Sequence, residues 1–209
     1  MTRREALDRL IQISADQGGY LTTAQAARLG VERTVLSDLV RGGDLRRVRR
    51  GVYAMRGTHH PHEREMAAWL SVERTLLPWE WHDGDPRAIV SHASAASFWD
   101  LGTIIPDLPS LTVRGAVPKS RLEIHTSRFD RDDWQWTHPE ILLRMPVTTP
   151  ARTVVDLALA GEEPDHVLRA AREAMSRGLM SDRDLRSAII RRPRAGPRIA
   201  HLIESLDAG

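Results

Sequence analysis

The 209-residue chain contains no cysteine, which excludes disulfide bonds and thiolate metal sites and is typical of a reducing compartment. No apolar run approaches the ~20 residues that a membrane-spanning helix needs. The N-terminus also lacks the apolar core of a signal peptide. These absences predict a cytoplasmic protein.

Lysine is almost absent as well, since Lys119 is the only one in the chain. Nucleases of the restriction-enzyme type need a lysine beside paired carboxylates around a metal ion, and no such carboxylates flank Lys119. The chain also has no G-x-x-x-x-G-K-[ST] loop and none of the H-R-D or D-F-G motifs of protein kinases. The sequence therefore argues against nuclease activity and against a nucleotide-binding or kinase site of the common kinds.

Charge is distributed unevenly, although 41% hydrophobic and 28% charged residues are ordinary for a globular protein and the formal net charge is only +2. Residues 41–56 hold six arginines and a single acid, Asp44. The rest of the chain after residue 56 is mildly acidic. This asymmetry predicts that only the N-terminal part meets nucleic acid.

The N-terminal pattern predicts a winged helix-turn-helix over residues 1–56. Thr22 and Gln25 form a capping box at the start of a helix over 23–29, and Gly30 ends it. A second helix over 32–41 has apolar residues at helical spacing. The sequence predicts a further helix over 2–17 and two strands, 45–48 and 52–55, joined by a turn.

The chemistry of this module suits DNA. Short polar and arginine side chains on the second helix can reach base edges in the major groove, and arginines on a β-ribbon can contact phosphates. The alternatives are a protein-interaction module and an arginine face that is only solvated. The candidate DNA-binding residues are Thr23, Arg33, Thr34, Ser37, Arg41, Arg46, Arg47, Arg49 and Arg50.

We expect an α+β protein in which residues 57–62 form a hinge and 63–209 form a C-terminal domain of a small mixed sheet covered by helices. Strands are expected at 88–90, 111–113, 122–125 and 141–147, with a turn at 118–119 between the second and third. Helices are expected from residue 149 onwards, the last over 197–206. The basic segment 191–194 could contact phosphate or an acidic partner, or could be solvated.

Two groups of residues are candidates for a catalytic or metal site. Three histidines in the hinge, His59, His60 and His62, could bind a metal ion, but solvated linker histidines are the simpler interpretation and no metal site is predicted. Ser91 and His92 stand at the start of a capped helix expected over 91–102 and do not form the G-x-S-x-G elbow of a hydrolase. Capping and packing roles are therefore favoured for them, with the helix ended by Gly102.

The ordered motifs of the chain resemble those of a known family. They are GYLTT at 19–23, GV at 30–31, LRRVRRGVY at 45–53, VSHASAA at 90–96 followed by LG at 101–102, and VTTPARTVVDLA at 147–158. This set resembles the AbiEi-type antitoxins of bacterial type IV toxin–antitoxin systems. It is also similar to actinobacterial antitoxins that are paired with nucleotidyltransferase toxins.

The resemblance implies that the winged helix binds promoter DNA and represses its own operon, while the C-terminal domain neutralises a cognate nucleotidyltransferase toxin. It implies no cofactor and no membrane partner. It assigns no role to Ser91, His92, Arg152 or Asp156; the i, i+4 spacing of the last two predicts an ion pair within one helix.

Two alternatives stay open. In the first, an atypical enzyme neutralises the toxin by covalent modification such as serine/threonine phosphorylation, with ATP and magnesium as cofactors and catalytic residues that the sequence does not reveal. In the second, the chain is a repressor that responds to a metabolite. That protein would need a pocket within residues 60–209.

Overall fold

The computed structural model describes residues 1–81, 85–117, 121–137, 143–192, 199–200 and 204. The chain divides into two compact units. Unit 1 comprises Met1–Ala88 and Trp136–Pro146, and unit 2 comprises Ile89–Gln135 and Val147–Gly209. The predicted domains are 1–56 and 63–209, with a hinge between them. They are defined as parts of the chain that fold independently, which differs from a division into compact units, so the domain boundaries stay a prediction.

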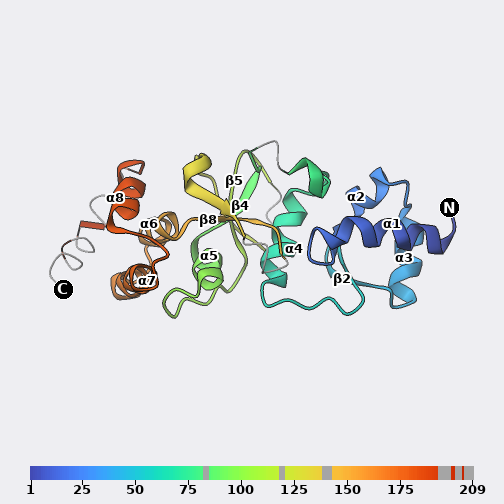
Figure 1. Ribbon diagram of the computed structural model, residues 1–209, viewed down its shortest axis with the longest axis horizontal. Helices are drawn as coiled ribbons and strands as arrows, with labels where there is room; N and C mark the ends of the chain where they lie inside the picture. Colours follow the sequence, from blue (N-terminus) through green and yellow to red (C-terminus); the bar gives the residue numbers. More distant parts are fainter. Residues whose placement is uncertain (82–84, 118–120, 138–142, 193–198, 201–203, 205–209) are drawn as a thin grey trace. The chain divides into compact units, whose positions relative to one another are not determined.

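Unit 1 begins with three helices and a three-stranded sheet (Figure 1). Thr2 and Thr22 both form capping boxes, with Glu5 and Gln25, so the first two helices begin where the sequence indicates. The elements, in chain order, are α1 Arg3–Ala15, β1 Tyr20–Thr22, α2 Thr23–Arg28, α3 Arg33–Arg41, β2 Leu45–Arg49, β3 Val52–Met55, α4 Glu63–Val72 and the 3-10 helix η1 Pro78–Glu80.

The core of unit 1 lies between α1, α2, α3 and one face of the sheet. Its buried side chains include Leu10, Leu21, Leu36, Leu39 and Leu45. The sheet is antiparallel throughout, with β3 in the centre between β1 and β2. This is the winged helix-turn-helix arrangement that the sequence predicts.

Helix α4 covers the other side of the sheet and carries Trp69, which is buried. Trp69 packs edge-on against Trp81 and Trp136, with ring centroids 4.8 and 6.0 Å away. Its indole N–H donates to the carbonyl oxygen of Ala88 at 3.0 Å. Trp136 belongs to the later segment of unit 1, so this aromatic cluster joins two parts of the chain that are far apart in sequence.

Unit 2 is built on a five-stranded sheet in the order β6-β5-β4-β8-β7. The unit boundary assigns one terminal residue of β4, β7 and β8 to unit 1. The elements are β4 Ala88–Val90, α5 His92–Trp99, β5 Ser110–Val113, β6 Glu123–His125, the 3-10 helix η2 Arg131–Asp133, β7 Trp134–Trp136, β8 Pro146–Thr148, α6 Pro150–Ala160, α7 Pro164–Ser176 and α8 Asp182–Ile190.

Strand pairing in unit 2 corrects two expectations. A turn between the strands near 111–113 and 122–125 implied a hairpin, but β5 and β6 are parallel, with Leu111 opposite Ile124. The predicted turn residues 118–119 lie outside the described part. The strand expected at 141–147 is β8, which begins only at Pro146 because residues 143–145 have no strand pairing; it is parallel to β4.

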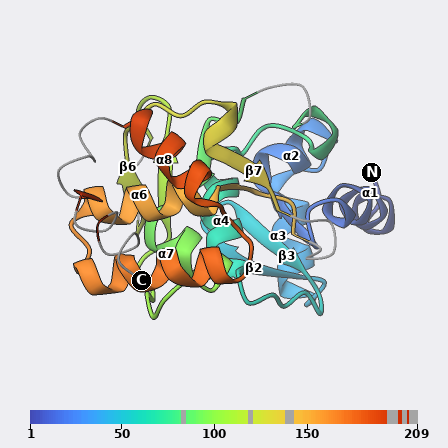
Figure 2. The same ribbon diagram turned by 60° about the vertical axis from the view of Figure 1, so that its left-hand side comes forward.

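The helices of unit 2 form a second apolar core. Helix α6 packs against α5, α7 and α8, and Figure 2 shows α6, α7 and α8 gathered in the orange and red part of the chain. Small residues such as Ala170, Ala171 and Ala174 allow close packing beside Val154 and Leu157. Helix α5 ends at Trp99, and its C-cap residue Asp100 has a left-handed backbone (φ +54°). The sequence predicts that Gly102 ends this helix. The helix expected over 197–206 lies mostly outside the described residues.

The mixture of an N-terminal antiparallel sheet with helices and a C-terminal mixed sheet with helices confirms the predicted α+β class. Among the helices that the structure describes, none is long and apolar enough to cross a membrane.

Candidate nucleic-acid interface and a buried polar cluster

Helix α3 presents a polar face next to a buried apolar one. Leu36 and Leu39 are buried, which fixes the rotation of the helix. The exposed side chains are Arg33, Thr34, Ser37, Asp38 and Arg41, and all of them except Asp38 are candidate DNA-binding residues. The helix thus has the composition of a recognition helix, with short polar groups between two arginines.

The exposed groups of α3 make only local contacts. The Ser37 hydroxyl donates to the carbonyl oxygen of Arg33 at 3.0 Å, and Arg41 pairs with Asp38 at 2.9 Å. Both members of this ion pair are largely exposed, so it contributes little and can exchange for a phosphate contact. Arg33 has no ion-pair partner among the described residues.

The β2–β3 ribbon divides its arginines between two faces. Side chains alternate along a strand, so Arg46 and Arg47 point to opposite faces of the ribbon. Arg47 lies opposite Tyr53, which packs against the core of the helix-turn-helix, and Arg46 lies opposite Ala54. Arg47 is therefore on the side of α3, whereas Arg46 is on the side of α4.

Arg46 is held within the chain by Glu63 at the start of α4. Its guanidinium donates to the two carboxylate oxygens at 2.9 and 2.5 Å and to the carbonyl oxygen of Thr58 at 3.1 Å. This hydrogen bonding from Arg46 lowers the pKa of Glu63. Glu63 also accepts from the hydroxyl of the buried Tyr20 at 3.0 Å, and burial together with Glu63 raises the pKa of that hydroxyl.

The ribbon turns through Arg50 and Gly51. Gly51 has φ +77°, which glycine adopts without strain. Its carbonyl oxygen accepts from the backbone N–H of Thr23 at 2.9 Å and lies 3.5 Å from the Thr23 hydroxyl. Thr23 therefore ties the turn to the start of α2. Arg50 is exposed, Arg49 is half-exposed, and the register shifts between Arg47 and Arg49.

The hinge histidines do not come together as a metal site. His60 and His62 have ring centroids 5.7 Å apart, and the His62 backbone N–H donates to Nδ1 of His60 at 3.1 Å. Burial lowers the pKa of His62. In the described ranges, no group of three or more histidine, aspartate or glutamate side chains is arranged to hold a metal ion.

A buried polar cluster lies in unit 2, where β4, β6 and β8 end. Ser91 follows β4; its hydroxyl oxygen lies 2.9 Å from Nδ1 of His92 and accepts from the Thr112 hydroxyl at 2.9 Å. Ser91 occupies the N-cap position of α5, but its side chain makes no capping hydrogen bond. The His92 ring stacks on that of His125 with centroids 3.4 Å apart, and His92 has φ +52°.

Two aspartates share the Arg152 guanidinium in the same cluster. Arg152 Nε donates to Asp156 at 2.7 Å, which confirms the predicted i, i+4 pair, and Nη1 lies 3.0 Å from Asp133. Burial acts to raise the pKa of Asp133, but Arg152 and Arg192 hold it below its ordinary value. Burial raises the pKa of Asp156 to about 6 against the pull of Arg152. Burial, followed by the charges of His125 and Arg152, lowers the pKa of His92 to about 2.

This geometry is not that of a hydrolase triad. A triad histidine contacts its serine through one ring nitrogen and its carboxylate through the other. Here the Ser91 oxygen and the Asp156 carboxylate, at 2.9 and 4.0 Å, both face Nδ1 of His92. The expected packing role agrees with the burial of Ser91 and His92, whereas the expected capping role is wrong, because the Ser91 side chain makes no capping hydrogen bond.

Sequence reasoning missed Asp133 and His125 as members of this cluster. Asp133 is fully buried and takes ion pairs from Arg152 and Arg192, the latter at 2.6 Å. Asp133 lies in the polar stretch 130–133, and only its position just before the alternating residues 134–136 hints at an anchored end. Arg191 and Arg192, expected in a basic arm, are half-buried; residues 193–194 lie outside the described part.

Comparison with known proteins places the N-terminal module in a class. Residues 8–56 match the model of a family described as "Transcriptional regulator, AbiEi antitoxin". The N-terminal domain is therefore similar to that of AbiEi antitoxin-type transcriptional regulators, and the matched stretch contains α2, α3 and the ribbon.

Among the solved structures, the crystal structure of the RV2827C protein from Mycobacterium tuberculosis resembles the chain over nearly its whole length. The two share 16% sequence identity with a TM-score of 0.56, over 96% of this chain and 77% of that one. At this identity the likeness concerns the fold. No curated protein matches the sequence.

Proposed function

We propose that the chain is a DNA-binding repressor of its own operon and an antitoxin against a nucleotidyltransferase toxin. The observation that carries the first part is the set of arginines at α3 and the ribbon, together with the family to which this stretch is similar. In the proposal, residues 1–56 bind the promoter, and residues 63–209 act on the toxin after a hinge at 57–62.

The recognition helix supplies base contacts in this proposal. With Leu36 and Leu39 anchored in the core, α3 offers Arg33, Thr34 and Ser37 to the major groove. Arg41 at the end of the helix reaches the flanking phosphates once it leaves Asp38. Arginine recognises guanine by a bidentate contact, so Arg33 is the residue of this face on which sequence preference would depend most.

The ribbon supplies phosphate contacts. Arg47 and Arg50 are exposed and have no ion-pair partner among the described residues, so binding a phosphate breaks no existing pair. Thr23 holds the turn in place, and Arg49 adds positive charge beside it. Arg46 has a different role in this proposal, because its guanidinium is already bound by Glu63.

The test compares two variants of neighbouring residues in the full chain. Arg47→Ala with Arg50→Ala should weaken binding to every duplex sequence and reduce the slope of log K against log salt by about 0.9 for each lost phosphate contact. The control, Arg46→Ala, removes one positive charge from the other face and should leave the slope unchanged. Equal slopes for all three proteins would rule out the ribbon as a phosphate-binding element.

The antitoxin part rests on the family description of the N-terminal domain and has its own experiment. The chain would be mixed with the product of the adjacent gene in the presence of ATP and magnesium, then analysed by size exclusion and intact mass. A co-eluting complex at unchanged mass is the expected result. A gain of one phosphoryl group on the partner without a complex would instead support covalent modification. If neither a complex nor a mass change were found, only the repressor function would remain.

A further inference from the structure

An open hollow of about 570 Å³ lies in unit 2 beyond the carboxyl ends of the parallel strands β5 and β6. Arg114 and Gly115 follow β5, and Ser127 and Arg128 follow β6. Ligands of α/β proteins bind preferentially outside the carboxyl ends of parallel strands. The volume is in the range of small-molecule sites, so the hollow has both the place and the size of a ligand site.

The lining of the hollow is positively charged. It contains three arginines, Arg114, Arg128 and Arg192, and one acid, Asp130. The Asp130 carboxylate is already used, since it accepts the backbone N–H of Asp132 at 3.2 Å at the start of η2. The hollow therefore favours an anionic ligand.

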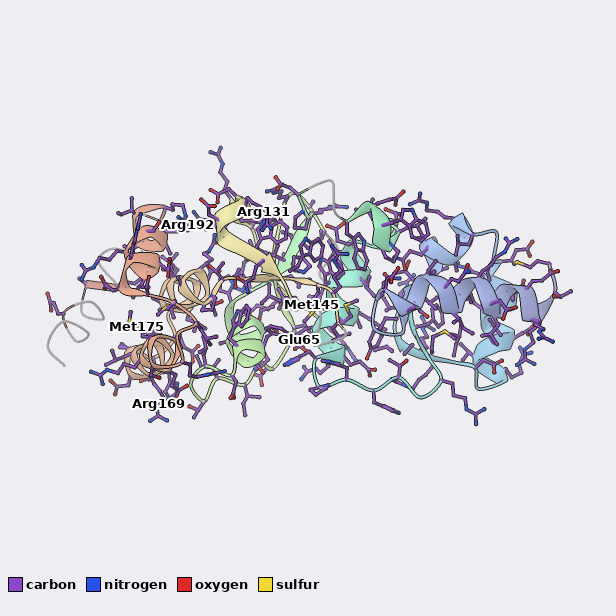
Figure 3. All side chains as sticks on the ribbon, viewed as in Figure 1. Glu65, Arg131, Met145, Arg169, Met175 and Arg192 are labelled. Atoms are coloured by element: carbon purple, nitrogen blue, oxygen red, sulfur yellow. The ribbon has the colours of Figure 1, made fainter. Side chains whose placement is uncertain are left out.

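Two of these arginines are fixed before any ligand binds. Arg114 lies over the ring of Phe129 at 4.3 Å and donates to its carbonyl oxygen at 2.8 Å. Arg192 donates to the carbonyl oxygen of Arg128 and to Asp133, both at 2.6 Å. Figure 3 labels Arg192 on its part of unit 2. Guanidinium groups held in this way lose little conformational entropy when they bind a ligand.

The buried cluster reaches the floor of the hollow. The Ser127 hydroxyl, which lines it, accepts a hydrogen bond from Nη2 of Arg152 at 3.0 Å. Within the described residues, Nη1 of Arg152 and Oδ1 of Asp133 are buried but have no hydrogen-bond partner, although both belong to ion pairs. Both atoms are accounted for by these ion pairs, so the case for a ligand rests on the residues that line the hollow.

We propose that this hollow binds a small phosphate-bearing anion. A doubly charged tetrahedral group can accept hydrogen bonds from more than one guanidinium group at once, which suits Arg114 and Arg128 better than a single carboxylate would. Arg114 and the exposed Arg128 contact the ligand, whereas Arg192, whose guanidinium is bound by Asp133, holds the backbone at Arg128 in place. This inference does not depend on DNA binding by unit 1, and it supplies the chain with a site for an effector.

The experiment titrates the full chain with inorganic phosphate and with pyrophosphate by calorimetry, with chloride keeping the ionic strength constant. Saturable binding of one anion per chain is expected. Arg128→Ala should weaken it about tenfold, the value of one charge-assisted hydrogen bond. The matched control is Arg169→Ala, which removes the same charge from an exposed position on α7, away from Arg192 in Figure 3, and should change binding by less than about twofold.

Several outcomes would overturn the proposal. Equal weakening by Arg128→Ala and Arg169→Ala would show diffuse electrostatic attraction, and acetate binding as tightly as phosphate would exclude a phosphate site. The absence of saturable heat would exclude an anion site altogether. If Arg128→Ala instead weakened duplex DNA binding and left phosphate binding unchanged, the hollow would be part of a DNA-binding surface.

Discussion

In unit 1, Arg33, Arg47 and Arg50 extend into solvent, whereas in unit 2 Arg152 is 1% exposed and lies between Asp133 and Asp156. An exposed guanidinium keeps its hydration until a partner arrives, so it can be used for binding. A buried guanidinium must have its partners in the same chain, because an unpaired buried charge is very costly. The position of an arginine in the fold thus decides whether it can bind a partner or instead supports the structure.

The strongest test of this difference between exposed and buried arginines is to replace the buried one. Arg152→Met leaves Asp133 and Asp156 without their shared cation, and we expect a loss of about 3–5 kcal/mol in the free energy of unfolding. Urea denaturation of the full chain measures it.

The control for this prediction is Arg128→Ala, which removes an exposed arginine from the same unit and should cost less than about 0.5 kcal/mol. A similarly small loss for Arg152→Met would mean that the buried ion pairs are not needed for stability. It would contradict the distinction between exposed and buried arginines.

A second prediction concerns pH. The pKa of His92 is about 2 in the folded chain against an ordinary 6.5, so the unfolded chain takes up a proton below pH 6.5 while the folded chain does not. His92 therefore lowers stability as the pH falls, by up to about 1.4 kcal/mol per pH unit. Asp156 acts in the opposite direction, since its folded pKa of about 6 exceeds the ordinary 3.8 and stability from this group rises as the pH falls from 6 towards 4.

Because the effects of His92 and Asp156 offset each other, the contribution of His92 is measured as a difference in unfolding free energy between the native chain and a variant. The free energy of unfolding would be followed from pH 7 to pH 4 for the native chain and for His92→Asn, a residue that tolerates the left-handed backbone at this position. The variant should gain stability relative to the native chain as the pH falls below 6.5. Parallel curves would show that folding does not lower the pKa of His92.

The third prediction concerns Arg46→Ala, an intermediate case between the two kinds of arginine. Its pair with Glu63 is partly exposed, so we expect a loss of less than about 1 kcal/mol in thermal or urea unfolding. A loss comparable to that of Arg152→Met would place Arg46 with the buried arginines.

The winged helix could be predicted from sequence because its signals are local. Capping boxes at Thr2 and Thr22 and the helical spacing of Leu36 and Leu39 act within a few residues of one another. The i, i+4 pair of Arg152 and Asp156 is also local. These features depend on backbone geometry that any helix shares, so no knowledge of the tertiary structure is needed.

The rest depends on contacts between distant residues. The parallel pairing of β5 with β6 cannot be distinguished from a hairpin by strand pattern alone. The partner of Arg46 lies in α4, and the opposite faces of Arg46 and Arg47 matter only once α4 covers one of them. The cluster around Asp133 joins residues 59 positions apart in sequence, which no local pattern reveals.

The discontinuity of unit 1 has a consequence for synthesis on the ribosome. Trp136 packs against Trp69 and Trp81, and Leu143 and Met145 are buried, all in a segment made after most strands of the second sheet. The nascent chain cannot complete its first unit until residue 146 has emerged, although domains usually fold in order from the N-terminus. Until then, the indole rings of Trp69 and Trp81 lack their contact with Trp136 and are accessible to chaperones.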